Sequence, residues 1–326
     1  MSTARENYDI FTRNKILISR RNFMHRLKLT VILTLILLFK ADSSIAASWV
    51  NFPTSWDIGQ AFAVSITSTA EYTQPIVTWM NRSIALNVEA GGAGKISYGL
   101  LGSDVRNIKP GNYKILFEFI QGGKKYKASG NIYLRARQYP KENLTVSPKM
   151  VNPPKKELPR IRSESQLVGT ALKTMTVPRK WTTPPQPPLA SITLTSNYGK
   201  QRVYNGQPRA GHNGADLRAV TGTSVRAPFA GTIVLAGFHY YAGGSLYIDS
   251  GNGVITAFFH LSSIAVKKGD KVAKGQIVAK SGATGRVTGP HLHYSLILGG
   301  QFVDPIPLLS TSITKMLKQG NIQQVN

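Results

Sequence analysis

Cysteine is missing from the sequence, which has 326 residues. Disulfide bridges, cysteine zinc sites and thiol nucleophiles are therefore excluded. Aspartate and glutamate are also scarce, with 15 residues against 40 lysines and arginines, and the formal net charge is +25. Such a charge favours anionic partners, namely nucleic acid, anionic lipid or an acidic cell-wall polymer. The chain has no RNP-type or zinc-finger pattern and no basic–aromatic stripe, so we predict that nucleic acid is not a partner.

Long hydrophobic runs are lacking as well. The most apolar stretch, Leu29–Phe39, covers 11 residues, whereas a spanning helix needs about 20. It follows basic residues and precedes the small residues of "ADSSIAAS", which offer a cleavage site after Ala46 or Ala47. This pattern is typical of a removable export signal. We predict that residues 1–47 direct export to the periplasm, and that the chain meets a membrane only during export.

Two export routes fit the residues before this run. The stretch "SRRNFMHR", from Ser19 to Arg26, resembles the twin-arginine signal, and Lys40 after the run also suits that route. The alternative is that Met24 is the true start, which would leave an ordinary general-secretion signal. We favour the twin-arginine route.

Residues 48–137 alternate between apolar and polar positions in short stretches, and glycine-rich turns such as "GGAG" and "QGGK" separate them. Six or seven short strands at this spacing predict a small β-sandwich with an immunoglobulin-like shape. The region contains no histidine and no evident acid–base pair. We interpret it as a positioning or binding module.

Residues 138–190 differ in composition, because the stretches "SPKMVNPPKKELP" and "VPRKWTTPPQPP" are rich in proline. Such segments are semi-rigid connectors. Between them, "RIRSESQLVGTALKTM" predicts one short amphipathic helix; the residues expected on its apolar face are Ile161, Leu167, Val168, Ala171 and Leu172. The alternative is a solvated linker.

Residues 191–310 return to short strands and glycine turns, without any pattern for a long helix. The region therefore predicts a second β domain, built on a sheet or barrel-like, and the fold class of the chain is all-β. Residues 311–326 form a short polar tail, which we expect to fray.

Five of the six histidines fall within the second β domain. His212 lies four residues before Asp216, and His291 lies two residues before His293. In an extended strand an even offset places both side chains on one face. Burying four such groups without partners would be costly, and a metal ion could supply the partner. Catalytic zinc keeps three protein ligands and one open position, so the remaining histidines could act as a base or as hydrogen-bond donors.

The motifs around these histidines resemble a known family. In order along the chain they are "HNGAD", "FFHLS", "VKKGDKVAKGQIVAKSG" and "TGRVTGPHLHYSL". Together they resemble the LytM/lysostaphin-type zinc metallopeptidases of the M23 class. The resemblance runs from about Leu194 to Pro307, from "LTSNYGKQR" to "VDPIPLL".

This resemblance implies one zinc ion per active site, with His212, Asp216 and His293 as ligands. It implies that His260 and His291 are the catalytic pair, one as a base and the other as a stabiliser of the oxyanion, with the two roles not yet divided between them. The implied substrate is the peptide stem of peptidoglycan. Because the sequence shows no separate targeting repeat, we favour a D,D-endopeptidase that cuts the cross-links. We expect the protein to be a monomer.

Two other functions compete with this hypothesis. The first is a non-enzymatic wall-binding protein or an activator of other murein hydrolases; all five site positions are intact, which argues for an enzyme. The second is a lipoyl- or biotin-carrier module, but methionine, common beside the modified lysine of such modules, is absent from residues 176–315. His239 matches no site position, and we expect it at the wall of the groove or at the surface.

Overall fold

The computed structural model describes residues 46–92 and 94–325, and from Ala47 onward these residues form one compact unit. The predicted export signal, residues 1–47, lies outside the described residues except for its last two positions. Among the described residues, no helix has the length and apolar character needed to cross a membrane.

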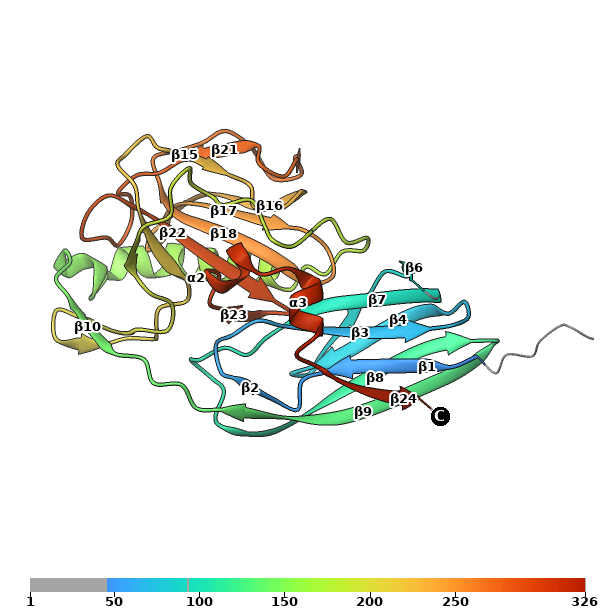
Figure 1. The fold of residues 1–326 in the computed structure, drawn as a ribbon. Helices are drawn as coiled ribbons and strands as arrows, with labels where there is room; N and C mark the ends of the chain where they lie inside the picture. Colours follow the sequence, from blue (N-terminus) through green and yellow to red (C-terminus); the bar gives the residue numbers. More distant parts are fainter. Residues whose placement is uncertain (1–45, 93, 326) are drawn as a thin grey trace, which may run out of the picture. The chain divides into compact units, whose positions relative to one another are not determined.

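The first part of the fold is a β-sandwich of two five-stranded sheets (Figure 1). One sheet has the order β24-β1-β3-β7-β6 and the other has the order β2-β9-β8-β4-β5. The strands are β1 (Ser48–Phe52), β2 (Ser55–Asp57), β3 (Phe62–Ser68), β4 (Thr73–Trp79), β5 (Arg82–Ala85), β6 (Glu89–Gly91), β7 (Gly94–Leu101), β8 (Gly111–Gln121), β9 (Lys124–Arg135) and β24 (Asn321–Val325). Alternation drives this packing: in β8, Ile115, Phe117 and Phe119 are buried in the core that both sheets share. The sandwich is confirmed, whereas its immunoglobulin-like character stays a prediction.

The polar tail does not fray as expected. Its residues form the short helix α3 (Ile313–Leu317) and strand β24, which pairs antiparallel with β1 from Ser48↔Val325 to Phe52↔Asn321. The amide of Asn51 also donates a hydrogen bond of 2.9 Å to the Leu317 carbonyl. Strand β24 is held mainly by backbone pairing with β1, because only Val325 of β24 is buried, whereas Met316 of α3 is buried in an apolar cluster. The alternation that reveals a strand is therefore missing from this segment.

The connector contains the predicted helix and one unexpected strand. They are β10 (Lys141–Leu144), the 3-10 helices η1 (Pro148–Met150) and η2 (Lys155–Glu157), and helix α2 (Leu158–Leu172). Ala171, Val168 and Leu172 of α2 pack into an apolar cluster, but Leu167 of the predicted apolar face is 50 % exposed. Glu164 accepts a hydrogen bond of 2.7 Å from the Tyr240 backbone amide. The connector is therefore packed onto the fold, which rules out a solvated linker.

The second part of the fold is centred on an eight-stranded sheet of order β11-β14-β22-β18-β17-β16-β20, with β23 paired to β22. Two three-stranded sheets accompany it, β15-β21-β19 and β10-β12-β13. The elements are β11 (Leu194–Ser196), β12 (Gln201–Tyr204), β13 (Gln207–Pro208), β14 (Ala215–Arg218), β15 (Ser224–Arg226), β16 (Gly231–His239), β17 (Gly243–Asp249), β18 (Val254–Leu261), β19 (Ser263–Ile264), β20 (Lys271–Val272), β21 (Ile277–Lys280), β22 (His291–Leu298), β23 (Gln301–Val303) and the 3-10 helix η3 (Pro307–Ser310).

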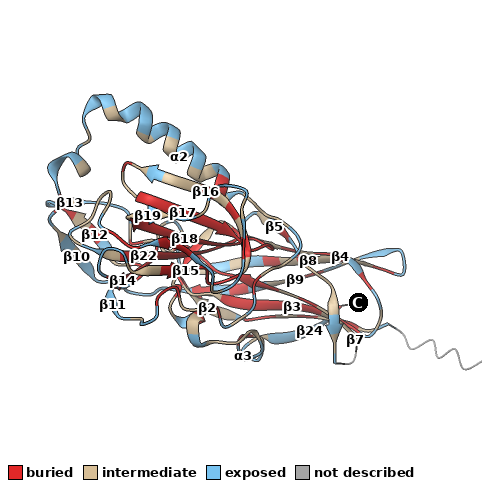
Figure 2. Cartoon of the chain, turned by 90° about the horizontal axis from the view of Figure 1, so that it is seen from above, coloured by how far each residue is buried: buried red, intermediate tan, exposed pale blue. Residues whose placement is uncertain are grey.

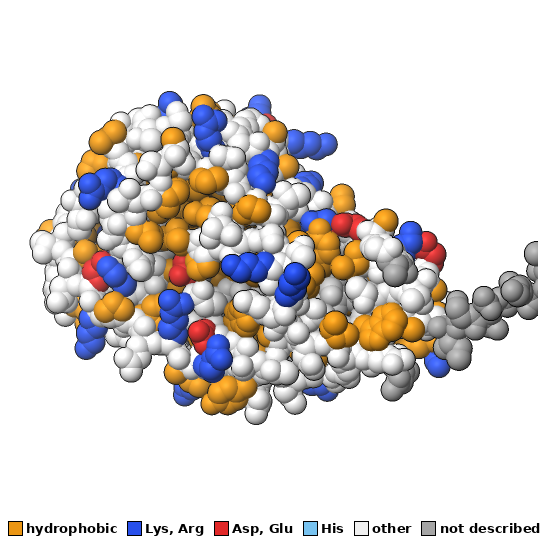
Figure 3. All heavy atoms as spheres, viewed as in Figure 1, with side chains coloured by type: hydrophobic (Ala, Val, Ile, Leu, Met, Phe, Trp, Pro, Cys, Tyr) orange, Lys and Arg blue, Asp and Glu red, His pale blue; other side chains and the backbone are white. Residues whose placement is uncertain are grey.

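The central strands β17, β18 and β22 are buried along nearly their whole length, as Figure 2 shows in red. A strand in that position is held on both faces, so it is a rigid support for side chains at its end. The all-β prediction is confirmed for the described residues. On the face drawn in Figure 3, Lys and Arg side chains are scattered rather than gathered in one patch, and Asp and Glu are few.

Candidate metal centre

Strand register brings two of the candidate ligands together. Strands β14 and β22 pair antiparallel, with Asp216 directly opposite His293. Side chains at such positions have Cβ atoms about 4.5–5.5 Å apart. His212 arrives differently: it lies in the loop before β14, where its amide donates a 2.8 Å hydrogen bond to the Lys200 carbonyl. Residues 212–216 are therefore not one extended strand, the condition under which their spacing predicted a common face, although the two side chains do meet.

The three candidate ligand atoms form a compact triangle. His212 Nε2 lies 3.0 Å from Asp216 Oδ1 and 3.0 Å from His293 Nδ1, and the distance from His293 Nδ1 to Asp216 Oδ1 is 2.9 Å. Ligands of one tetrahedral zinc ion with bonds of about 2.0–2.1 Å would lie ~3.3 Å apart. All three residues are buried. The donor set and its spacing fit a single ion.

Hydrogen bonds behind the two imidazoles leave the lone pairs where a metal needs them. His212 Nδ1 lies 2.8 Å from the Asn197 carbonyl, which can only accept, so Nδ1 carries the proton and Nε2 does not. His293 Nε2 lies 2.8 Å from Ser295 Oγ, whose own proton goes to the Asn213 carbonyl at 3.0 Å. Ser295 therefore accepts the Nε2 proton of His293, and Nδ1 keeps its lone pair. Partners of this kind orient metal-binding histidines.

Gly214 is required by this packing. A Cβ atom at this position would lie 2.5 Å from the Tyr294 carbonyl oxygen and 2.6 Å from His293 Nε2. Both distances are far shorter than a normal van der Waals contact, and the Tyr294 oxygen is a backbone atom. Only glycine lets the loop carrying His212 approach β22 so closely.

The protonation states also suit a cation. Burial raises the pKa of Asp216, but the proximity of His212 and His293 lowers it by more, so its pKa lies well below the ordinary value. Burial lowers the pKa of His293 to about 4, although Asp216 opposes the shift. At neutral pH the site therefore offers one carboxylate and neutral imidazole, the forms that bind metal.

His260 and His291 lie beside the triangle. Their ring centroids are 4.8 Å apart, and His291 Nε2 is 3.6 Å from Asp216 Oδ1. Each Nδ1 lies 2.9 Å from a carbonyl oxygen, that of Thr284 for His260 and that of Gly289 for His291. Each Nδ1 therefore carries the proton, which leaves each Nε2 unprotonated. Burial, then His291 and His293, lower the pKa of His260 to about 3.

The backbone at His260 is strained. Its φ is +64°, in the left-handed region, where a side chain other than glycine costs about 1–2 kcal/mol. The register of β17 and β18 shifts here, with Gly244 opposite Leu261 but Leu246 opposite Phe258. One extra residue of β18 is thus accommodated as a β-bulge, which re-aims the His260 side chain.

All five predicted site residues line one cavity of about 500 Å³. The connector contributes Leu144, Val146 and Val168 to its wall. The guanidinium of Arg286 stacks over the rings of Tyr204 and Tyr241, at 4.4 and 4.8 Å from their centroids. His239 is not part of this lining; it is half-buried and hydrogen-bonds Ser245.

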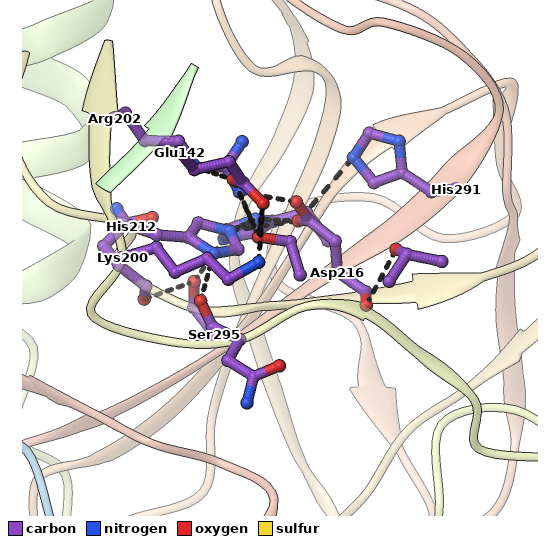
Figure 4. Close-up of polar contacts among 12 residues, drawn as sticks. Glu142, Lys200, Arg202, His212, Asp216, His291 and Ser295 are labelled. Atoms are coloured by element: carbon purple, nitrogen blue, oxygen red, sulfur yellow. Dashed lines mark hydrogen bonds and ion pairs between the residues drawn. The ribbon is translucent and has the colours of Figure 1, made fainter. Parts of the chain in front are cut away.

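Sequence reasoning missed the charged groups behind Asp216 (Figure 4). Arg202 Nη2 donates a 2.7 Å hydrogen bond to Asp216 Oδ2. Glu142 lies on the far side of Arg202, with Oε2 at 3.0 Å from Arg202 Nε, and it also pairs with Lys200 at 2.7 Å. Arg202 is the last residue of "LTSNYGKQR", the stretch at which the resemblance to the family begins, and nothing in that stretch predicts a contact with Asp216. Glu142 stands in the proline-rich connector, where no local pattern marks it.

Comparisons with known proteins agree with this geometry. A profile of the family described as Peptidase family M23 matches residues 210–305. The peptidoglycan DD-endopeptidase ShyA of Vibrio cholerae is 43 % identical over 131 residues, 39 % of this chain and 30 % of that protein. The glycyl-glycine endopeptidase ALE-1 of Staphylococcus capitis is 36 % identical over 132 residues, 37 % of this chain and 36 % of that protein. The matched part thus spans only about a third of each of these relatives.

One solved structure shares the fold over most of the chain. It is a crystal structure of an M23 peptidase from Pseudomonas aeruginosa, with a TM-score of 0.57, 24 % identity, and coverage of 73 % of this chain and 90 % of that one. At this identity the likeness concerns the fold alone.

Proposed function

Residues 210–305 form a domain of peptidase family M23, and from this premise we propose that the protein is a zinc-dependent hydrolase of peptidoglycan peptides. The observation that carries the proposal is the convergence of His212 Nε2, Asp216 Oδ1 and His293 Nδ1 within 3.0 Å of one another, in a cavity that two further histidines line. These three atoms would hold the zinc ion. Zinc bound there supplies a Lewis acid that brings the pKa of water to about 7.

The two other histidines then handle protons. Because both Nδ1 protons are donated to carbonyls, both Nε2 atoms are acceptors at neutral pH. His291 Nε2 lies 3.6 Å from Asp216 Oδ1, beside the three metal ligands, whereas burial lowers the pKa of His260 to about 3, so we assign the proton of the attacking water to His291. His260 Nε2 would accept the other hydrogen of that water and orient it. Once protonated, His291 can donate to the oxyanion, a contact worth about 10²–10³ in rate in other hydrolases, and then to the leaving amine.

The substrate assignment rests on the relatives. ShyA is named as a peptidoglycan DD-endopeptidase, so we propose that this protein cuts a D,D bond in the cross-links between stem peptides. The formal net charge of +25 favours an acidic wall polymer. We place the protein in the cell envelope, exported to the periplasm, with the sandwich of residues 48–137 and β24 as its positioning module.

The test is digestion of purified peptidoglycan by the purified protein, followed by mass analysis of the fragments. The proposal predicts fewer cross-linked dimers and more monomeric muropeptides, with glycan strands intact. Treatment with a chelator should stop the reaction, and His291→Ala should do the same. Zinc binding without any cleavage would instead support the non-enzymatic alternative.

A further inference from the structure

The connector contributes a carboxylate to the surroundings of the metal centre. Strand β10 pairs in parallel with β12, and this register places Glu142 beside Arg202. Glu142 lies well before residues 210–305, which match the peptidase family. A residue outside the matched domain therefore reaches the group that holds Asp216 (Figure 4).

Glu142 is held in place by three side chains. Both of its oxygens lie 2.9 Å from Ser196 Oγ, and Oε1 accepts a 2.7 Å hydrogen bond from Lys200 Nζ. Oε2 lies 3.0 Å from Arg202 Nε, as an ion pair rather than a well-directed hydrogen bond. Burial raises the pKa of Glu142, but Lys200, Arg202 and Ser196 lower it by more. The side chain is only 17 % exposed, so it is a charged and largely enclosed carboxylate.

Arg202 connects this carboxylate to Asp216. Its side chain is 10 % exposed, and Nη2 contacts both Asp216 Oδ2, at 2.7 Å, and Ser196 Oγ, at 3.1 Å. The other oxygen, Asp216 Oδ1, is the one that faces His212 and His293. The hydrogen bond from Arg202 to Oδ2 fixes the rotation of the Asp216 carboxylate, so that Oδ1 points toward His212 and His293.

The charges show why Glu142 matters. Lys200 and Arg202 carry two positive charges, and Glu142 and Asp216 carry two negative charges. Without Glu142, two cations would stand behind a single carboxylate that has to bind a dication. Without Glu142, Arg202 would also have only one of its two carboxylate partners, Asp216, left to hold its side chain in place. Both effects weaken the attraction of the site for zinc.

We propose that Glu142, acting through Arg202, is a positioning residue for Asp216, so that the connector strand completes the metal centre of the peptidase domain. This inference rests on the proposed function, because it presumes that zinc binds to His212, Asp216 and His293. It gives the connector a function in the chemistry, beyond joining two domains.

The experiment measures zinc affinity by competition with a chromophoric chelator, on the full chain stripped of metal. Glu142→Gln should bind zinc about tenfold more weakly, in the range found when partners of metal ligands are removed. The matched control is Glu89→Gln, which removes a carboxylate paired with Arg179, a side chain 13 % exposed. Neither Glu89 nor Arg179 lines the metal cavity. The zinc affinity of Glu89→Gln should therefore stay within twofold of the wild type.

A second variant tests the same connection without removing Glu142. Arg202→Lys keeps the charge but lacks the fork that spans two carboxylates, and we expect a similar tenfold loss. The visible spectrum of the cobalt-substituted proteins should change for both variants and stay unchanged for Glu89→Gln, because it reports ligand geometry. If both variants bind zinc within twofold of the wild type, the inference is wrong. If the wild type itself takes up no stoichiometric zinc, the proposed metal centre fails instead.

Discussion

Replacement of Ser295 by alanine removes a single oxygen behind the metal cluster. Ser295 is fully buried, and its hydroxyl both accepts from His293 Nε2 and donates to the Asn213 carbonyl. Without it, the tautomer of His293 that can bind zinc leaves a buried N–H group unpaired. The other tautomer can donate from Nδ1 to Asp216 Oδ1, at 2.9 Å, but it no longer has a lone pair for the metal.

The size of the effect follows from this choice between tautomers. A buried donor without a partner costs about 1–3 kcal/mol. In the variant, the zinc-bound protein contains this unpaired N–H group, whereas the metal-free protein avoids it because His293 can adopt the other tautomer. The difference lowers the free energy of zinc binding. Since about 1.4 kcal/mol is a factor of ten in a binding constant, zinc should bind about 5- to 150-fold more weakly to Ser295→Ala.

The assay is competition for zinc between a chelator of known affinity and the metal-free protein at pH 7.5. Ser245→Ala is the matched control, because Ser245 is equally buried and its hydroxyl also contacts a histidine, His239, which is not one of the three candidate ligands. The control should lose stability without losing zinc affinity. Wild-type affinity in Ser295→Ala, or an equal loss in both variants, would show that the Ser295 hydroxyl does not hold His293 in its zinc-binding tautomer.

His293→Ala should lose both zinc, measured by elemental analysis, and hydrolysis, whereas His291→Ala should keep zinc and lose only hydrolysis; equal loss of zinc would contradict the division of roles. Gly214→Ala should melt at a lower temperature and fail to retain zinc, because its Cβ would lie 2.6 Å from His293 Nε2; unchanged melting would show that the loop can yield. In the folded, metal-free protein the pKa is lowered to about 3 for His260 and to about 4 for His293, whereas a histidine of the unfolded chain has a pKa of about 6.5. Below about pH 6.5 the unfolded chain therefore binds more protons than the folded protein. The unfolding free energy in denaturant titrations should therefore fall as pH drops from about 6 to about 4, by up to about 1.4 kcal/mol per pH unit for each residue. His260→Asn should reduce this slope, and a flat profile would contradict the buried, neutral state of both rings.

Local periodicity predicted part of this site. His291 and His293 do lie on one strand, β22, and the spacing of two placed them on the same side. For His212 and Asp216 the same argument reached the right proximity for the wrong reason. His212 lies in a loop whose position depends on hydrogen bonds with residues 199 and 200, so its distance from Asp216 reflects tertiary contacts and not strand geometry.

The features that sequence could not reveal depend on pairing between distant segments. Glu142 contacts Arg202 because β10 pairs with β12, which lies 60 residues further along the sequence. Each strand has only four residues, KENL and QRVY, which is too short for a pattern of apolar and polar residues to predict it. The tail strand β24 is held by its backbone against β1, at the opposite end of the described chain. The left-handed conformation of His260 arises from a bulge between β17 and β18, which depends on the register of two strands together.

Stepwise addition of zinc to metal-free protein, with the cleavage of peptidoglycan cross-links followed at each step, tests whether the cluster holds a catalytic ion. If His212, Asp216 and His293 hold a single catalytic ion, hydrolysis should be absent at first, rise in proportion to added zinc and level off at one equivalent per chain. Full hydrolysis by protein shown to contain no metal, or a rise that continues well beyond one equivalent, would show that these three residues do not hold a single catalytic ion.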